Sequence, residues 1–293
     1  MSKSPTKFAL FGNSHQEARA TELCNLIKAL KGRKASITIE RRFHDYIVNK
    51  LGIDASDIET FDEICPEVDI AVSVGGDGTF LRTAKLIAQR DIPILGINTG
   101  RLGFLSDIPS NEIYATIDCI CNGDYRVEER ANLHIECEGY EDYPYALNEI
   151  AVLKHDIASM INIDVEINGE LITTYWADGL IICTPTGSTA YSLSNGGPIL
   201  VPQLNSFCIT PVAPHSLNIR PIVVSDSSVI TLHTESRSGS FLVAVDGRNA
   251  QCKNHTKLTL RKADRTTKVV KINNKTFFHT LKEKLMWGAD VRK

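Results

Sequence analysis

Hydrophobic positions in the first third of the chain follow two alternating periodicities. Short apolar runs typical of strands alternate with longer segments in which apolar residues recur at helical spacing. The runs at 69–76 and 92–98 are almost continuous, as in strands buried on both faces of a parallel sheet. Repeated strand–helix–strand units of this kind predict a doubly wound parallel sheet. The predicted strands are 7–12, 36–40, 69–76 and 92–98, and the predicted helices are 15–32, 41–52 and 79–90.

Beyond about residue 128 the pattern changes to the period of two that is typical of half-buried strands. Asn168 and Gly169 form a hairpin signal between two such runs, and helical spacing is scarce over 129–274. The basic stretch 261–275 is interpreted as a solvated hairpin. Helical spacing returns at 276–288. The predicted strands are 133–140, 145–153, 160–167, 170–179, 180–183, 229–235, 241–247, 257–263 and 268–273.

These patterns predict two closely packed domains of class α/β + β. Residues 1–128 form an α/β domain with a parallel sheet, and the C-terminal helix, about 276–293, packs back on it. Residues 129–275 form a mainly antiparallel β domain.

Composition narrows the possible partners. A net charge of −3 gives no general attraction to nucleic acid or to anionic lipid, so neither is an expected partner. The start of the chain lacks the pattern of a secretory signal, and no apolar run approaches the length of a membrane span. We therefore expect a cytoplasmic protein whose eight scattered cysteines are reduced thiols, mostly core filler.

The stretch Gly75-Gly76-Asp77-Gly78-Thr79 follows a predicted buried strand and opens a predicted helix. Glycines permit positive φ and let a phosphate approach the free N–H groups of the turn, at the sheet edge where open parallel sheets bind ligands. Asp77 would repel a phosphate, so a hydroxyl proton or a magnesium ion is its expected partner. The alternative is a tight turn with Asp77 as the helix N-cap. No P-loop motif and no G-x-G-x-x-G motif at the first strand occurs.

Two further stretches combine polar residues with an apolar setting. Asn148 and Glu149 stand inside the predicted strand 145–153, where at most one of them should face the core; the alternative is outward-facing polarity. Residues 184–194 are nearly all small or hydroxylated, as a wall against a planar ring or a sugar would be. Read alone, this second stretch is equally a hydroxyl-rich connection between strands, with Tyr191 in the core.

In this order and spacing, GGDGT, the Asn-Glu pair and DGLIICTPTGSTAYSLSNGGPI resemble the NAD kinase family. The resemblance runs from about residue 69 to the C-terminal helix. It implies a Rossmann-like N-terminal domain that handles the phosphate donor and an all-β C-terminal domain that binds NAD. It also implies transfer of the γ-phosphoryl of ATP, or of polyphosphate in some members, to the adenosine ribose 2′-hydroxyl of NAD. A divalent ion, Mg²⁺, would be held mainly by the donor phosphates, and assembly as a homodimer or homotetramer is expected.

The same resemblance assigns roles to individual residues. Asp77 would act as general base, and Arg82 would reach the donor phosphates beside the glycine turn. Asp178 matches an aspartate that reaches NAD from a neighbouring subunit in several members. Trp176 and Ser159 lie where members differ in residue type, and His215 is open between a phosphate contact and packing. The implied donor-binding residues are Gly75, Gly76, Gly78, Thr79 and Arg82; the implied NAD-binding residues are Asp77, Gly78, Asn148, Glu149, Trp176, Asp178, Thr189, Ala190, Tyr191, Ser192, Leu193, Ser194, Ala213 and Arg248.

Two other hypotheses stay open at this stage. A lipid kinase of the diacylglycerol type shares the GGDGT turn, but it does not account for TPTGSTAYSLS. A non-enzymatic NAD-binding sensor would tolerate loss of Asp77, which this chain retains.

Overall fold

The computed structural model describes residues 5–13, 20–63, 65–138, 140–141, 143–156, 159–272 and 275–288. The chain divides into two compact units. The first comprises residues 1–129 and 268–293, and the second comprises residues 130–267. Two long strands, β7 (Tyr125–Glu136) and β18 (Lys257–Ile272), each continue from one unit into the other.

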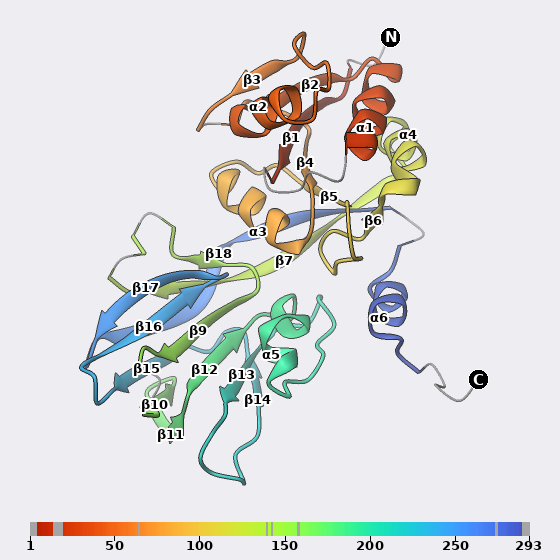
Figure 1. Ribbon diagram of the computed structural model, residues 1–293. Helices are drawn as coiled ribbons and strands as arrows, with labels where there is room; N and C mark the ends of the chain where they lie inside the picture. The colour runs from red at the N-terminus through yellow and green to blue at the C-terminus, as the bar shows by residue number, and fades with distance from the viewer. Residues whose placement is uncertain are drawn as a thin grey trace. The chain divides into compact units, whose positions relative to one another are not determined.

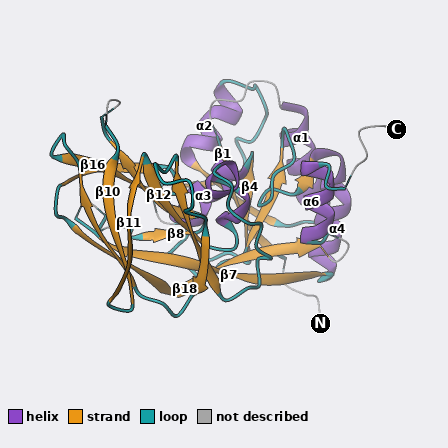
Figure 2. Cartoon of the chain, turned by 90° about the horizontal axis from the view of Figure 1, so that it is seen from below, coloured by secondary structure: helices purple, strands orange, loops and turns teal. Residues whose placement is uncertain are grey.

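The first unit is built on a parallel sheet in the order β5-β4-β1-β2-β3, with β6 beside β5 (Figure 1). The strands are hydrogen-bonded in parallel, for example Phe8 opposite Ile70 and Ala71 opposite Ile94. Every helix labelled in Figure 2 belongs to this unit. Its strands are β1 (Lys7–Gly12), β2 (Ser36–Glu40), β3 (Glu59–Phe61), β4 (Ile70–Val74), β5 (Ile94–Asn98) and β6 (Ile108–Pro109); its helices are α1 (Ala20–Gly32), α2 (Arg41–Asn49), α3 (Asp77–Leu86), the 3-10 turn η1 (Ser110–Glu112), α4 (Ile113–Asn122) and α6 (Phe277–Leu285).

This sheet places the ends of its central strands at one edge. β4 is buried along its whole length, which its continuous apolar sequence predicts. Parallel strands end on the same side of a sheet, so Gly12 of β1, Val74 of β4 and Asn98 of β5 mark a common carboxyl edge. The Gly75 N–H donates to the Ile97 carbonyl at 2.9 Å, which ties the turn after β4 to β5.

The second unit contains two antiparallel sheets, in the orders β14-β13-β12-β9-β16-β17 and β11-β10-β15-β18. Their apolar faces meet in one core, which includes Ile150 and Leu180 from the first sheet and Ile163 and Leu232 from the second. The other strands of this unit are β8 (Tyr145–Ala146), β9 (Glu149–Lys154), β10 (Ile161–Ile167), β11 (Glu170–Ala177), β12 (Gly179–Cys183), β13 (Ser206–Val212), β14 (Ile222–Ser225), β15 (Ile230–Glu235), β16 (Ser240–Val245) and β17 (Arg248–Lys253); a 3-10 turn, η2 (Gly187–Thr189), precedes the short helix α5 (Tyr191–Ser194).

The fold class and the return of the C-terminal helix to the first unit are confirmed. The Thr276 side chain caps α6 by accepting from the His279 N–H, and the Phe277 ring lies 6.1 Å from the Phe104 ring of the same unit. The hairpin Asn168-Gly169 is also confirmed, because both residues have positive φ, 53° and 85°. Residues 15–19 of the first predicted helix lie outside the described residues.

The prediction of a solvated hairpin at 261–275 is wrong. β18 is one continuous strand from Lys257 to Ile272, and Lys271 within it is buried in an ion pair of 2.6 Å with Asp107. A basic composition indicates a solvated segment only when its charges have no buried partner, and Asp107 supplies one. The same strand makes the observed division differ from the predicted one, since 268–272 belong to the first unit, where Val269 pairs with Ile94 of β5.

Helix α4 had no counterpart in the prediction. Its signals were present in the sequence, because Ile113, Ile117 and Ile120 repeat at helical spacing and all three are buried. Gly123 then ends the helix in the left-handed conformation, with φ of 87°. Among the described residues, no helix is long and apolar enough to cross a membrane.

Candidate functional site

The glycine turn after β4 leaves open space at two of its three glycines. Gly75 has φ of 154°, and a Cβ on it would lie 2.4 Å from Thr79 Oγ1, so glycine is needed there for the turn itself. A Cβ on Gly76 or on Gly78 would meet nothing within 4 Å. These two positions are therefore not filled by the protein, and they lie at the N-terminus of α3, where backbone N–H groups favour an anion.

The Asp77 carboxylate is fixed by a second loop of the same unit. It accepts hydrogen bonds from three consecutive backbone N–H groups, those of Phe104 at 2.9 Å, Leu105 at 3.0 Å and Ser106 at 2.9 Å. A Cβ on Gly103 would lie 2.0 Å from Asp77 Oδ1, so only glycine admits the carboxylate there. Asp77 is not the helix N-cap, because Gly76 holds that position and no side chain caps it.

Arg82 and Lys284 lie near this turn, and of these only Arg82 was predicted as a site residue. The Arg82 guanidinium donates to the Gly12 carbonyl at 3.1 Å and pairs with the buried carboxylate of Glu40. These contacts already hold the guanidinium in place. A contact between Arg82 and the donor phosphates stays a prediction. Lys284 of α6 was not predicted, and its Nζ lies 3.6 Å from Asp77 Oδ2.

In the second unit, the turn 147–149 is held by the carboxylate of Asp246. Asp246 Oδ2 accepts from the Leu147 N–H at 2.7 Å, and its Oδ1 accepts from the N–H groups of Asn148 at 2.9 Å and Glu149 at 3.1 Å. Asp246 itself has a positive φ of 47° before Gly247. Sequence reasoning missed this residue, which stands between β16 and the predicted NAD-binding residue Arg248.

This arrangement leaves acceptor atoms of the Asn-Glu pair without partners. Asn148 Oδ1 and Glu149 Oε2 are buried and have no hydrogen-bond partner among the described residues. Outward-facing polarity does not fit, because Asn148 is 7% exposed. Burial raises the pKa of Glu149 to about 8, and the neighbouring Asp246 carboxylate adds to the shift. Buried polar atoms are normally paired, so these two point to a ligand.

The segment 184–194 packs directly on that turn. The Thr184 hydroxyl donates to the Leu147 carbonyl at 2.6 Å, and a Cβ on Gly187 would lie 2.1 Å from the Asn148 carbonyl oxygen. The Tyr191 backbone N–H donates to the Glu149 carboxyl. This close approach explains why the segment needs small residues.

Some of the hydroxyl groups that were predicted to line a ligand therefore make hydrogen bonds within the protein instead. Besides Thr184, the buried Ser188 donates to the Pro185 carbonyl at 2.7 Å, and the buried Ser192 pairs with Thr210 at 2.8 Å. The predicted binding residues that keep some exposure are Thr189, Ala190, Tyr191, Leu193 and Ser194. Tyr191 is 38% exposed, so it is not a core residue.

The remaining predicted residues are spread over the second unit. Asp178 pairs with Lys154 at 2.7 Å, and Arg248 donates to the carbonyls of Tyr143 and Tyr145 at 3.2 and 3.1 Å. Ala213 is exposed with a positive φ of 44° directly after β13.

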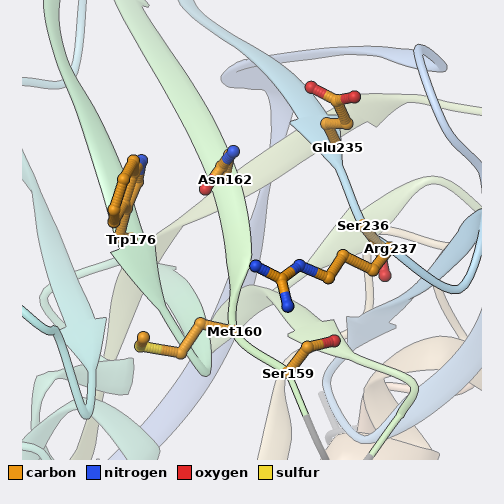
Figure 3. A pocket seen from close by; sticks show the side chains of 7 residues that line it. All are labelled: Ser159, Met160, Asn162, Trp176, Glu235, Ser236 and Arg237. Atoms are coloured by element: carbon orange, nitrogen blue, oxygen red, sulfur yellow. The ribbon is translucent and has the colours of Figure 1, made fainter.

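A pocket of about 470 Å³ is lined by Trp176 of β11 and by Ser159, which precedes β10 (Figure 3). The Arg237 guanidinium points into it, and Trp176 is 54% exposed on its wall. On a smaller neighbouring pocket, the His215 ring lies 6.2 Å from the Trp176 ring. The lining residues are Ser159, Met160, Asn162, Trp176, Glu235, Ser236 and Arg237.

Comparison with known proteins gives a consistent result. The family model for the ATP-NAD kinase N-terminal domain matches residues 11–125, and the model for the C-terminal domain matches residues 147–272. An NAD kinase of Bacteroides fragilis (strain ATCC 25285) is 52% identical over 288 residues, covering 98% of this chain and 99% of the relative. One of Porphyromonas gingivalis (strain W83) is 41% identical over 286 residues, with 98% and 99% coverage.

Solved structures show the same architecture. The crystal structure of an NAD kinase from Archaeoglobus fulgidus in complex with ATP matches with a TM-score of 0.73 and 27% identity, covering 96% of this chain and 99% of that one. The yeast NADH kinase complexed with NADH matches with a TM-score of 0.84, covering 99% of this chain and 90% of that one. At 23% identity, this second likeness bears on the fold alone.

Proposed function

The chain belongs to the NAD kinase family and phosphorylates NAD with ATP, and we propose that the turn 147–149 binds the adenosine of NAD while Asp77 serves its 2′-hydroxyl. The observation that carries the first part is the pair of buried, unpaired acceptors, Asn148 Oδ1 and Glu149 Oε2. Leaving such atoms unpaired costs stability, and a ligand with hydroxyl and amino donors removes that cost. Adenosine offers both kinds of donor.

The turn is preorganised for this task. Asp246 fixes three backbone N–H groups of the turn, so Asn148 and Glu149 need no rearrangement before binding. Glu149 accepts from ribose hydroxyls in this proposal, and Asn148 contacts the base edge. The exposed residues among 189–194 line the rings, with Tyr191 as an aromatic wall.

The proposed role of Asp77 toward the 2′-hydroxyl is supported by a lone pair that its carboxylate retains. Its Oδ1 accepts two amides, whereas Oδ2 accepts one and keeps a lone pair for a hydroxyl proton. In the proposed step the bond between the 2′-oxygen and the γ-phosphorus forms, the bond from that phosphorus to ADP breaks, and the hydroxyl proton passes to Asp77. Phosphoryl transfer depends mainly on positioning and charge stabilisation, so orienting the hydroxyl is as important as removing its proton.

We propose that Mg²⁺ enters this site with the phosphates of the donor. Among the described residues, no group of three or more His, Cys, Asp or Glu side chains could hold a metal ion. Mg²⁺ commonly binds through substrate phosphates with few protein ligands. When bound, it would neutralise charge on the donor phosphates, and the open positions at Gly76 and Gly78 leave space for them.

The finer assignments extend from the same proposal. We propose that the chain self-associates as a homodimer or homotetramer in which Asp178 contacts NAD held by a neighbour, and that Trp176 also contacts NAD. Asp178 is 35% exposed on its side chain beside Lys154, which leaves it accessible. Arg248 and Ala213 would contribute to the shape of the NAD site rather than donate hydrogen bonds from their side chains. The Arg248 guanidinium already donates to two backbone carbonyls.

A mass-resolved assay with purified protein, Mg²⁺ and either ATP or polyphosphate tests the reaction, with NAD, NADH and a diacylglycerol as acceptors. We expect NAD phosphorylated at the 2′-position. In parallel, Glu149→Gln should weaken equilibrium binding of NAD. The matched control is Glu166→Gln, on β10 of the same unit, whose carboxylate lies 33% exposed near His233. Equal NAD affinity in the Glu149 variant and the control would refute the adenosine assignment, and phosphatidate as product would indicate the lipid kinase reaction.

A further inference from the structure

The Asp77 site poses an electrostatic problem that its predicted residues do not solve. Donor phosphates at the glycine turn would approach a carboxylate, and like charges repel. Arg82 was the expected compensating cation, but it is bound to Glu40 and to the Gly12 carbonyl. Besides Mg²⁺ on the donor, a cation of the protein close to Asp77 would offset this repulsion.

Lys284 of the C-terminal helix occupies that place. Its Nζ lies 3.6 Å from Asp77 Oδ2 and 4.7 Å from the centre of the Phe104 ring. Phe104 is one of the residues whose backbone N–H holds Asp77, so Lys284 and the Asp77 carboxylate share one support. The Phe277 ring, at the other end of α6, lies 6.1 Å from the Phe104 ring, so both ends of α6 reach the same residue.

The distance between Lys284 and Asp77 leaves the lysine ammonium able to move to another anion. A separation of 3.6 Å is longer than a direct hydrogen bond, so the ammonium neutralises Asp77 without spending an N–H donor on it. The side chain is 32% exposed, and an ammonium carries three rotatable donors on a flexible stem. Phosphate oxygens beside Gly76 and Gly78 would attract it more strongly than one carboxylate oxygen at this distance.

We infer that Lys284 is the substrate-contacting cation of the phosphoryl-transfer site, balancing Asp77 in the free protein and binding phosphate oxygens of the nucleotide donor during transfer. This inference rests on the proposed role of Asp77. It gives the C-terminal helix a task in the reaction besides packing, because α6 carries Lys284 to the glycine turn.

Substitutions at Lys284 separate charge from packing. Lys284→Met keeps the apolar stem over Phe104 and removes the charge, whereas Lys284→Arg keeps a charge. The matched control is Lys282→Met, an exposed lysine in the same last turn of α6. We expect Lys284→Met to lower kcat/KM for ATP by about 10²–10³, the usual loss for one preorganised charge-stabilising group. Equilibrium binding of NAD should stay within about twofold of the control, a factor worth less than about 0.5 kcal/mol.

The conservative variant and chemical rescue decide between a contact and a structural role. Lys284→Arg should recover most of the activity lost in Lys284→Met, and ethylammonium added to Lys284→Ala should restore part of it in a saturable way. Activity of Lys284→Met equal to that of Lys282→Met would overturn the inference. A loss that neither arginine nor ethylammonium restores would also overturn it and assign Lys284 to packing.

Measuring Asp77→Asn in the same series keeps the two proposals apart. A normal Lys284→Met beside an impaired Asp77→Asn refutes the role of Lys284 alone. Near-normal turnover of Asp77→Asn refutes the proposed role of Asp77, whatever the lysine variants do.

Discussion

NAD binding at neutral pH should release close to one proton, and Glu149 is the group that loses it. In the free protein, burial raises the pKa of Glu149 to about 8, with a further contribution from Asp246. Burial also raises the pKa of Asp246, and the three amide N–H groups that its carboxylate accepts oppose that rise. Ribose hydroxyls that donate to Glu149 favour its carboxylate form, so bound NAD should lower the pKa.

The size of the effect follows from the pKa of Glu149 in the free protein. With that pKa near 8, Glu149 is about 90% protonated at pH 7. If bound NAD brings the pKa to about 6 or below, about 0.8 proton leaves for each NAD bound. Between the two pKa values, the Kd for NAD should fall about tenfold for each unit by which the pH rises. This is a change of about 1.4 kcal/mol in the binding free energy.

Isothermal titration calorimetry in two buffers of different ionisation enthalpy measures this release directly. The observed binding enthalpy should differ between the buffers by the number of released protons times the difference in ionisation enthalpy. Glu149→Gln should abolish the difference and make the Kd independent of pH over 6–8. Zero release or proton uptake in the unsubstituted protein would refute the assignment of Glu149 as acceptor of ribose hydroxyls.

Stability gives an independent check with a defined sign. A carboxyl whose pKa is higher in the folded chain than in the unfolded chain binds its proton more tightly when folded. Its contribution to the free energy of unfolding is therefore present at low pH and declines as pH rises from about 4.5 to about 8. Over that window, the Glu149→Gln variant should gain stability relative to the unsubstituted protein, by about 1.4 kcal/mol per unit of pKa shift. Urea unfolding at several pH values measures the difference.

Three further predictions test the surroundings of the site. Asp77→Asn should lower turnover by about 10²–10⁴, the range for a positioned acid–base group, while NAD binding survives; steady-state kinetics and equilibrium binding decide. Gly187→Ala should raise the Kd for NAD about tenfold or more, because its Cβ would lie 2.1 Å from a backbone oxygen of the turn 147–149, whereas Gly32→Ala, with open space, should not change it. Lys271→Met should destabilise the first unit by about 3–5 kcal/mol, because it leaves the buried Asp107 charge unpaired; urea unfolding with a normal midpoint would contradict this.

The sequence predicted those parts of the site that depend on neighbouring residues. A continuous apolar run followed by three glycines around Asp77 indicated a buried strand, a turn and a helix start, and β4 and α3 have that arrangement. The hairpin at Asn168 and the change of period near residue 128 were equally local signals. Sequence spacing also brought Asn148 and Glu149 forward as candidates, although it could not show that both have buried acceptor atoms.

What the sequence could not show depends on partners far along the chain. Lys284 lies 207 positions after Asp77, and nothing in the helical pattern of 276–288 indicates which element it meets. Arg82 was assigned to phosphates because it follows the glycine turn, yet the buried Glu40 at the end of β2 holds it. Charge patterns predict solvation or ligand binding only when no buried residue of opposite charge competes.

Asp77 and Asp246 make the same kind of hydrogen bonds to the backbone, but their surroundings differ. Each carboxylate accepts three consecutive backbone N–H groups, and each thereby fixes a turn of its own unit. The Asp246 oxygens face the turn that they hold, and no cation is within ion-pair distance of them among the described residues, whereas Asp77 Oδ2 lies 3.6 Å from the Lys284 Nζ and its side chain is 29% exposed. If support of a turn were the whole role of Asp77, its asparagine variant would lose stability as we expect of Asp246→Asn, and activity would fall in proportion. Loss of turnover in Asp77→Asn without the loss of stability expected for Asp246→Asn would instead separate the chemistry of the Asp77 carboxylate from the support that both provide.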